Sequence, residues 1–82
     1  MISPQEVETM IQSKLPEAKV QVAGDGQHFE AVIVSAEFEG KSRVKQHQLV
    51  YSALTEAMAS DIIHAIALKT YTPQDWQSAN RV

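Results

Sequence analysis

Apolar residues recur at helical spacing along residues 3–15 of the 82-residue chain, and polar residues mark where this helix begins and ends. Ser3 can cap the helix, Pro4 suits its first position, and Glu6 can complete a capping box with Ser3. Pro16 cannot continue the helix, because its ring removes a hydrogen bond and clashes with the preceding turn. The sequence therefore predicts a helix that begins at Pro4 and ends before Pro16.

The next part of the chain changes from helical spacing to the alternation that is typical of strands. Residues 19–23 alternate weakly between polar and apolar, and residues 29–35 are rich in β-branched side chains. The tripeptide Gly24-Asp25-Gly26 lies between these two segments, and its residues tolerate the positive φ that tight turns require. The pattern predicts a β-hairpin.

A second helical pattern follows a polar connector at residues 38–42, where Ser42 can act as the cap. Residues 55–60 are rich in alanine and methionine, so they are expected to continue as a second, short helix. The apolar side of the longer helix is predicted to carry five residues: Val44, His47, Val50, Tyr51 and Leu54.

Residues 62–70 are apolar and β-branched enough to predict a third strand. Residues 72–75 repeat the capping pattern of the first helix, with Tyr71 and Trp76 in the staple positions, so a short C-terminal helix should follow directly. The complete order is helix, strand, strand, helix, helix, strand, helix. It predicts an α+β fold in which helices pack on a three-stranded mixed sheet, and residues 1–82 form a single domain.

Composition excludes several classes of function. The chain has no cysteine, which excludes a disulfide framework, a nucleophilic thiol and an all-thiolate metal site built from this chain alone. No signal peptide or membrane-spanning stretch is visible, so a cytoplasmic protein without membrane contact is expected. The net charge of −3 argues against a surface that coats nucleic acid generally. No nucleophilic or acid–base set is recognisable, and we do not expect an enzyme.

Two histidines occupy matching places in the predicted sheet, since His28 opens the second strand and His64 opens the third. The helical crossover between these strands permits a parallel pairing, in which both strands start at the same edge of the sheet. Neighbouring strands lie roughly 5 Å apart, so this pairing would bring the two imidazoles together, whereas an antiparallel pairing would separate them by about 20 Å. The sequence leaves both pairings open.

Two imidazoles are too few to hold a metal tightly, but a [2Fe–2S] cluster can use two imidazoles beside two thiolates. The chain could supply the imidazole half of such a ligand set, with a partner supplying the sulfur. Alternatively, His28 is a solvated loop residue and His64 a core histidine with a satisfied hydrogen bond. His47, on the apolar side of its helix, is expected to be a core residue.

Several short motifs occur in an order that resembles the BolA family almost from end to end. They are Gly24-Asp25-Gly26, His28-Phe29, residues 38–42 (FEGKS), His47, Tyr51, Ile63-His64-Ala65 and Thr72-Pro73. The stretches GDGQHF and SRVKQ resemble the IbaG branch of the family. The resemblance implies a BolA-like fold similar to class II KH domains, which agrees with the predicted element order.

The resemblance also implies a function and a partner. Proteins of this family associate with monothiol glutaredoxins that carry a Cys-Gly-Phe-Ser motif, and they share a [2Fe–2S] cluster to which the glutaredoxin cysteine and glutathione contribute sulfur. By this likeness, His64 is the ligand from the third strand and His28 takes the place of the second ligand, from the hairpin loop. The chain would then act in iron–sulfur cluster trafficking or in iron and redox sensing, as a monomer or weak homodimer when alone.

Two other functions remain open. Many BolA-like proteins read Arg-His-Arg where this chain has Gln46-His47-Gln48, a change that removes two positive charges from the segment most often proposed to contact nucleic acid. Lys41, Arg43 and Lys45 nevertheless lie where a KH-like fold could approach a phosphate backbone, as in a DNA-binding regulator of stress and morphology genes. These charges could equally be ordinary solvated residues at a helix start. The third function is a structural domain in which both histidines are packed.

Overall fold

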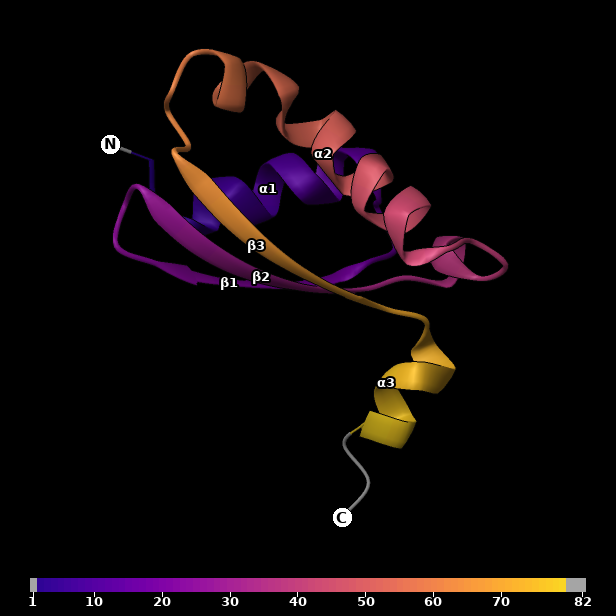
Figure 1. The fold of residues 1–82 in the computed structure, drawn as a ribbon. Helices are drawn as coiled ribbons and strands as arrows, with labels where there is room; N and C mark the ends of the chain where they lie inside the picture. The colour runs from indigo at the N-terminus through magenta and orange to yellow at the C-terminus, as the bar shows by residue number, and fades with distance from the viewer. Residues whose placement is uncertain (1, 80–82) are drawn as a thin grey trace.

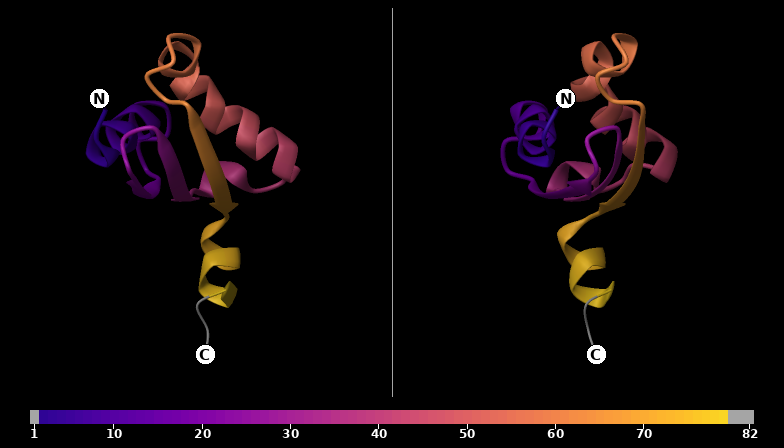
Figure 2. Two further views of the ribbon diagram at one scale, coloured as in Figure 1. Left: turned by 60° about the vertical axis from the view of Figure 1, so that its left-hand side comes forward. Right: turned by 90° about the vertical axis from the view of Figure 1, so that its left-hand side faces the viewer.

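The protein has two layers, with helices covering one face of a three-stranded sheet (Figure 1). The computed structural model describes residues 2–79. In chain order the elements are α1 (Pro4–Lys14), β1 (Lys19–Gly24), β2 (His28–Val34), the 3-10 turn η1 (Ala36–Phe38), α2 (Arg43–Ala59), β3 (Ala65–Tyr71) and α3 (Pro73–Ala79). Helices α1 and α2 lie over the same face of the sheet, whereas α3 projects from the end of β3 (Figure 2).

Helix α1 forms where the sequence predicts it. The Ser3 hydroxyl accepts a hydrogen bond from the Glu6 N–H at 3.2 Å, and the Glu6 carboxylate accepts one from the Ser3 N–H at 3.2 Å. This capping box satisfies two N–H groups for which the first turn of a helix has no partner. Val7 and Ile11 are fully buried on the inner side of the helix. The cap and the apolar face together fix α1 over the sheet.

The sheet has the order β1-β2-β3 and is mixed, as predicted. Strands β1 and β2 form the antiparallel hairpin, and β2 pairs in parallel with β3, with His28 opposite Ala65 and Val34 opposite Tyr71. The crossover through α2 therefore starts β2 and β3 at the same edge of the sheet. Of the two pairings that the sequence left open, the parallel one is correct.

Strand β3 begins later than predicted, and His64 lies directly before it instead of inside it. The N–H groups of Ile62 and Ile63 both donate to the Ala57 carbonyl, at 2.9 and 3.1 Å, and Asp61 has a φ of 61°. These residues therefore close the C-terminus of α2 in the manner of a helix cap and cannot join the sheet. Ile63 is buried by this turn, which explains its apolar character without a strand.

The predicted division of the second helical region into two helices is wrong. Helix α2 runs for 17 residues without interruption. It contains neither glycine nor proline between its cap at Ser42 and its end at Ser60, so nothing in the sequence breaks the backbone hydrogen-bond ladder. The short 3-10 turn η1, which was not predicted, precedes α2.

The buried face of α2 also differs from the predicted one. Val44 and Tyr51 are 66% and 38% exposed, and the buried residues of the helix are Gln46, Val50, Leu54 and Ala57. Gln46 tolerates burial because its Nε2 donates to the carbonyls of Phe38 and Lys41 at 3.1 and 3.0 Å, while its Oε1 accepts the Thr70 hydroxyl at 2.7 Å. The polar side chain thus joins η1, α2 and β3, and satisfied hydrogen bonds replace apolar contact.

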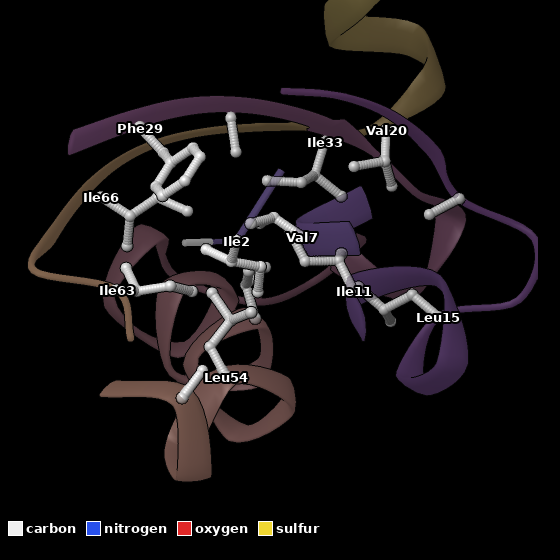
Figure 3. Packing of buried hydrophobic residues seen from close by; sticks show 14 of the residues in the cluster. Ile2, Val7, Ile11, Leu15, Val20, Phe29, Ile33, Leu54, Ile63 and Ile66 are labelled. Carbon is white, nitrogen blue, oxygen red and sulfur yellow. The ribbon is translucent and has the colours of Figure 1, made fainter. Parts of the chain in front are cut away.

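The core lies between the helical layer and the sheet (Figure 3). Ile11 and Leu15 from the α1 region meet Ile33 from β2, and Leu54 and Ile63 from the α2 region complete the cluster. Helix α3 contributes no buried residue, and its visible link to β3 is an edge-to-face contact between Tyr71 and Trp76 with ring centroids 5.2 Å apart. Among residues 2–79, no helix has both the length and the apolar character needed to cross a membrane.

Candidate functional site

The two histidines lie side by side at the rim of the sheet where β2 and β3 begin. His28 is the first residue of β2, and His64 immediately precedes β3. Their ring centroids are 6.0 Å apart, with an angle of 50° between the ring planes. The parallel register that places His28 opposite Ala65 produces this pair. The short separation predicted for a parallel sheet is confirmed.

Backbone hydrogen bonds hold the two histidine-bearing segments together. The carbonyl of Gln27, in the hairpin turn, accepts from the N–H groups of His64 and Ala65 at 3.0 and 3.1 Å. These two bonds extend the parallel ladder by one step beyond β2. The backbone positions of both histidines are therefore fixed by the sheet.

The hairpin turn that carries His28 depends on a close approach at Gly24. A Cβ added at this glycine would lie 2.5 Å from the carbonyl oxygen of His28 and 2.5 Å from Cδ1 of Phe29. Gly26 has a φ of 101°, a conformation that residues with a side chain rarely adopt. The glycines predicted from the GDG sequence thus allow the chain to turn tightly beneath the histidine.

Asp25 is the acidic neighbour of this pair. One carboxylate oxygen accepts the N–H groups of His28 and Gln27 at 2.9 and 3.1 Å, and the other lies 3.8 Å from Nδ1 of His28. The hydrogen bond from the His28 N–H, followed by that from Gln27, lowers the pKa of Asp25 below its ordinary value.

Both rings are accessible from outside the molecule. The side chain of His28 is 64% exposed, and His64 is also exposed. Burial therefore does not explain His64, and the alternative of a packed core histidine is wrong. Within residues 2–79, no group of three or more histidine, aspartate or glutamate side chains is placed to hold a metal ion. A tightly held metal at this rim would need further ligands from another molecule.

One exposed apolar side chain, that of Ile62, lies next to the histidine pair. Ile62 is 48% exposed and lines a hollow of about 370 Å³ together with Gly26, Gln27 and Asp61. Single apolar side chains are common on protein surfaces, so Ile62 supports a docking surface only together with the hollow and the histidine pair beside it. Its exposure was not predicted, because residues 62–70 were expected to form a buried strand.

His47 lies on a different part of the molecule. It is half-buried on α2 and lines a small cavity that α2 forms with the second half of β3. Its Nε2 is buried and has no hydrogen-bond partner among residues 2–79. The prediction of a core residue is thus correct in part, because Nε2 is buried while the residue as a whole is only half-buried.

The three predicted nucleic-acid contacts, Lys41, Arg43 and Lys45, are all exposed at the start of α2. The ammonium group of Lys41 donates to the carbonyl of Glu37 at 2.6 Å, which places this charge over η1. The histidine pair lies near the opposite end of α2, since His64 follows the turn that ends this helix. The structure therefore places the basic residues and the two histidines on separate surfaces.

Comparison with known proteins supports the likeness seen in the motifs, since the family model for BolA-like proteins matches residues 1–75. The chain belongs to the BolA family. This BolA-family chain is 42% identical over 71 residues to the acid stress protein IbaG of Escherichia coli K12, covering 87% of this chain and 84% of that protein. A BolA homologue from Coxiella burnetii has a solved structure with a TM-score of 0.84 and 44% identity, covering 94% of this chain and 99% of that one.

A further BolA relative has a name that describes a different role. The DNA-binding transcriptional regulator BolA of Haemophilus influenzae is 42% identical over 57 residues, which cover 70% of this chain and 54% of that protein. The two curated relatives are thus named as a stress protein and as a transcriptional regulator, and neither name describes an enzyme.

Proposed function

We propose that this BolA-family protein is a non-enzymatic adaptor that shares a [2Fe–2S] cluster with a monothiol glutaredoxin in the cytoplasm. His28 and His64 would supply imidazole ligands, while the glutaredoxin cysteine and glutathione would supply thiolates. The observation that carries the proposal is the exposed pair of imidazoles, 6.0 Å apart at one rim of the sheet. The proposed role is in cluster trafficking or in iron and redox sensing.

The donor set fits this cofactor. An imidazole nitrogen binds a metal at about 2 Å, so two rings at this separation can both reach one two-iron cluster. Imidazoles replace two thiolates in known [2Fe–2S] centres and raise the reduction potential, because a neutral ligand takes the place of an anion. The carboxylate of Asp25 lies on the Nδ1 side of His28, at 3.8 Å, so that ring would bind the cluster through Nε2. Exposed Ile62 would contribute to the docking surface of the partner.

The test is an anaerobic titration of cluster-loaded monothiol glutaredoxin, in the presence of glutathione, with this protein. We expect a new visible circular dichroism spectrum, since imidazole replaces thiolate at the cluster. The variant His64→Ala should lose the new spectrum. The variant Gln48→Ala is the control, because it shortens an exposed side chain on α2 away from the histidine rim. A spectrum that stays unchanged on addition of the wild-type protein would refute the proposal.

The second candidate function is DNA binding. It is favoured by the name of the Haemophilus influenzae relative and by the exposed Lys41, Arg43 and Lys45 at the start of α2. The net charge of −3 makes binding to DNA of any sequence unfavourable, so this function requires a specific site. If it operates, duplex binding should weaken steeply with salt, and replacement of the three basic residues by glutamine should reduce that salt dependence. If duplex binding survives the triple replacement, these three residues do not form the DNA-binding surface.

A further inference from the structure

The outer edge of β3 carries backbone groups that the sheet does not use. The Ala65 N–H donates to Gln27, and the Tyr71 carbonyl accepts from Ser35, so both of these residues are bonded toward β2. Pairing alternates along a strand, so the N–H and C=O groups of the intervening alternate residues point away from the sheet. These residues are Ile66, Leu68 and Thr70. Their outward N–H and C=O groups have no partner among residues 2–79.

The opposite edge of the sheet, formed by β1, is partly covered. The N–H of Val22, which points outward from β1, donates to the carboxylate of Glu8 on α1 at 3.4 Å. Helix α1 packs beside β1 and covers this edge, whereas both views of Figure 2 show β3 at the outer margin of the sheet. An unpaired strand edge is a template for another strand. The chain protects one edge with a side chain and leaves the other available.

The open edge has positive charge on both of its sides. On the helical side, a cavity of about 140 Å³ runs between α2 and β3 and is lined by Arg43, His47 and residues 68–71. On the uncovered face of the sheet, Lys69 is exposed opposite Val32 in the ladder, and the exposed Glu30 of β2 lines the same hollow as Lys69 and offsets part of its charge. No carboxylate lines the cavity between α2 and β3. A strand added at this edge would direct alternate side chains toward Arg43 and toward Lys69.

We propose that the outer edge of β3 binds an extended, acidic segment of a partner protein by strand addition. The N–H and C=O groups of Ile66, Leu68 and Thr70 would pair with the backbone of that segment, and its carboxylates would lie near Arg43 and Lys69. A peptide backbone fits this edge because it offers donors and acceptors in alternation. A phosphodiester backbone offers acceptors alone, so it would leave the outward carbonyls unpaired.

This surface differs from the histidine rim. The histidines precede or open their strands, whereas the cavity with Arg43 lies along the second half of β3. The paired edge begins at Ile66, two positions after His64, so the two sites adjoin at the start of β3. The proposal does not depend on the cluster. It assigns to the chain a second protein-binding surface, which recognises a segment by its extended backbone and its negative charge.

The test uses synthetic peptides with the seven-residue length of β3, built from threonine and valine with either two central glutamates or two central glutamines. A third peptide contains the glutamates and has alternate backbone nitrogens methylated. NMR of the labelled protein should show slower amide exchange at Ile66, Leu68 and Thr70 when the glutamate peptide is added. The glutamine peptide should bind about fivefold more weakly, as expected for exposed charge pairs. Methylation of the pairing nitrogens should abolish the protection.

Charge variants complete the test without disturbing the core. Arg43→Gln and Lys69→Gln should each reduce the preference for glutamate to about twofold or less, whereas Lys14→Gln, an exposed control on α1, should preserve it. The proposal is overturned if millimolar glutamate peptide does not protect the three amides, or if the methylated peptide binds equally well. It is also overturned if decathymidylate protects these amides and the peptides do not, which would assign the edge to single-stranded nucleic acid.

Discussion

At the scale of single residues, the histidine pair depends on Gly24, which has no side chain where β1 turns toward β2. In Gly24→Ala the new Cβ would meet the His28 carbonyl and the Phe29 ring, each at 2.5 Å. The turn would have to shift, and we expect a loss of about 1 to 3 kcal/mol in the free energy of unfolding, as for other overpacked sites. Urea unfolding measures this loss.

The displacement in Gly24→Ala should also reach the histidine rim, because the clash is with the residue that carries one of the two rings. The ring NMR signals of His28 should therefore shift. Gln21→Ala, on an exposed position of the same strand, is the control and should change the free energy by less than about 0.5 kcal/mol. If Gly24→Ala is equally mild, the close approach beneath His28 does not constrain the turn.

Asp25 gives the hairpin turn a dependence on pH. Hydrogen bonds from His28 and Gln27 lower its pKa in the folded protein. A carboxylate with a lowered pKa stabilises the fold fully above its unfolded value of about 3.9, and this stabilisation is lost as the pH falls through the folded value. Carboxyl carbon shifts should therefore show Asp25 titrating below its ordinary range, and the amides of Gln27 and His28 should exchange faster once it is protonated.

The matched variant for this titration is Asp25→Asn. Its side-chain oxygen can still accept the N–H groups of His28 and Gln27, but the amide does not titrate in this range. The acid-dependent loosening of the turn should therefore disappear while the turn itself remains. An Asp25 that titrates at or above its ordinary value would show that these hydrogen bonds do not favour the charged form.

At the scale of elements, Gln46 is the polar residue that joins η1, α2 and β3. Gln46→Ala would leave the Thr70 hydroxyl and the carbonyls of Phe38 and Lys41 without this partner in a buried setting. Unsatisfied buried groups cost about 1 to 3 kcal/mol each. We expect the free energy of unfolding to fall by about 2 to 4 kcal/mol. This loss is smaller than the sum over the three groups, because water can enter and bind some of them.

Two control experiments distinguish the contribution of the Gln46 hydrogen bonds from a general effect of substitutions in α2. Gln48→Ala changes an exposed position of the same helix and should be nearly neutral. Combining Gln46→Ala with Thr70→Val removes both ends of one hydrogen bond, so the double variant should be less destabilised than the sum of the two single variants. Additive losses would show that the bond between these side chains contributes nothing of its own.

These elements also show which features a sequence can predict. The caps of α1 and α3 depend on residues within one turn of each other, so Ser3 with Glu6, and Thr72 with Asp75, are legible in sequence. The burial of Gln46 depends on Thr70, which lies 24 positions away. No local pattern reports such a partner.

The position of the histidine pair was predictable only in part. A helical crossover permits parallel pairing of β2 and β3, so the placement of both histidines at one rim of the sheet was one of two predicted arrangements. The exposure of His64 was not, because it results from a turn in which Ile62 and Ile63 bond back to Ala57. A short apolar segment is compatible with a buried strand and with a turn that closes a helix, because either structure can bury an isoleucine such as Ile63.

At the scale of the whole molecule, the sheet provides two surfaces, one at the start of β3 and one along its outer edge. The histidine rim is next to the exposed apolar side chain of Ile62, and the open edge lies between the charges of Arg43 and Lys69. Both surfaces depend on the two-layer core formed by α1, α2 and the sheet. The core therefore has to stay folded while partners bind at the edges of the sheet.

Helix α3 should be dispensable for that core, since none of its residues is buried. Removal of the chain after Thr72 deletes the edge-to-face contact of Trp76 with Tyr71, which is worth about 0.5 to 1.5 kcal/mol beyond its buried area. We expect the truncated protein to unfold cooperatively in urea, with a loss of about 1 to 2 kcal/mol, and to keep the amide spectrum of β2 and β3. Trp76→Ala should account for most of this loss and Gln77→Ala for almost none of it. A truncated chain that fails to fold would mean that α3 is part of the core and that the uncovered face of the sheet needs it.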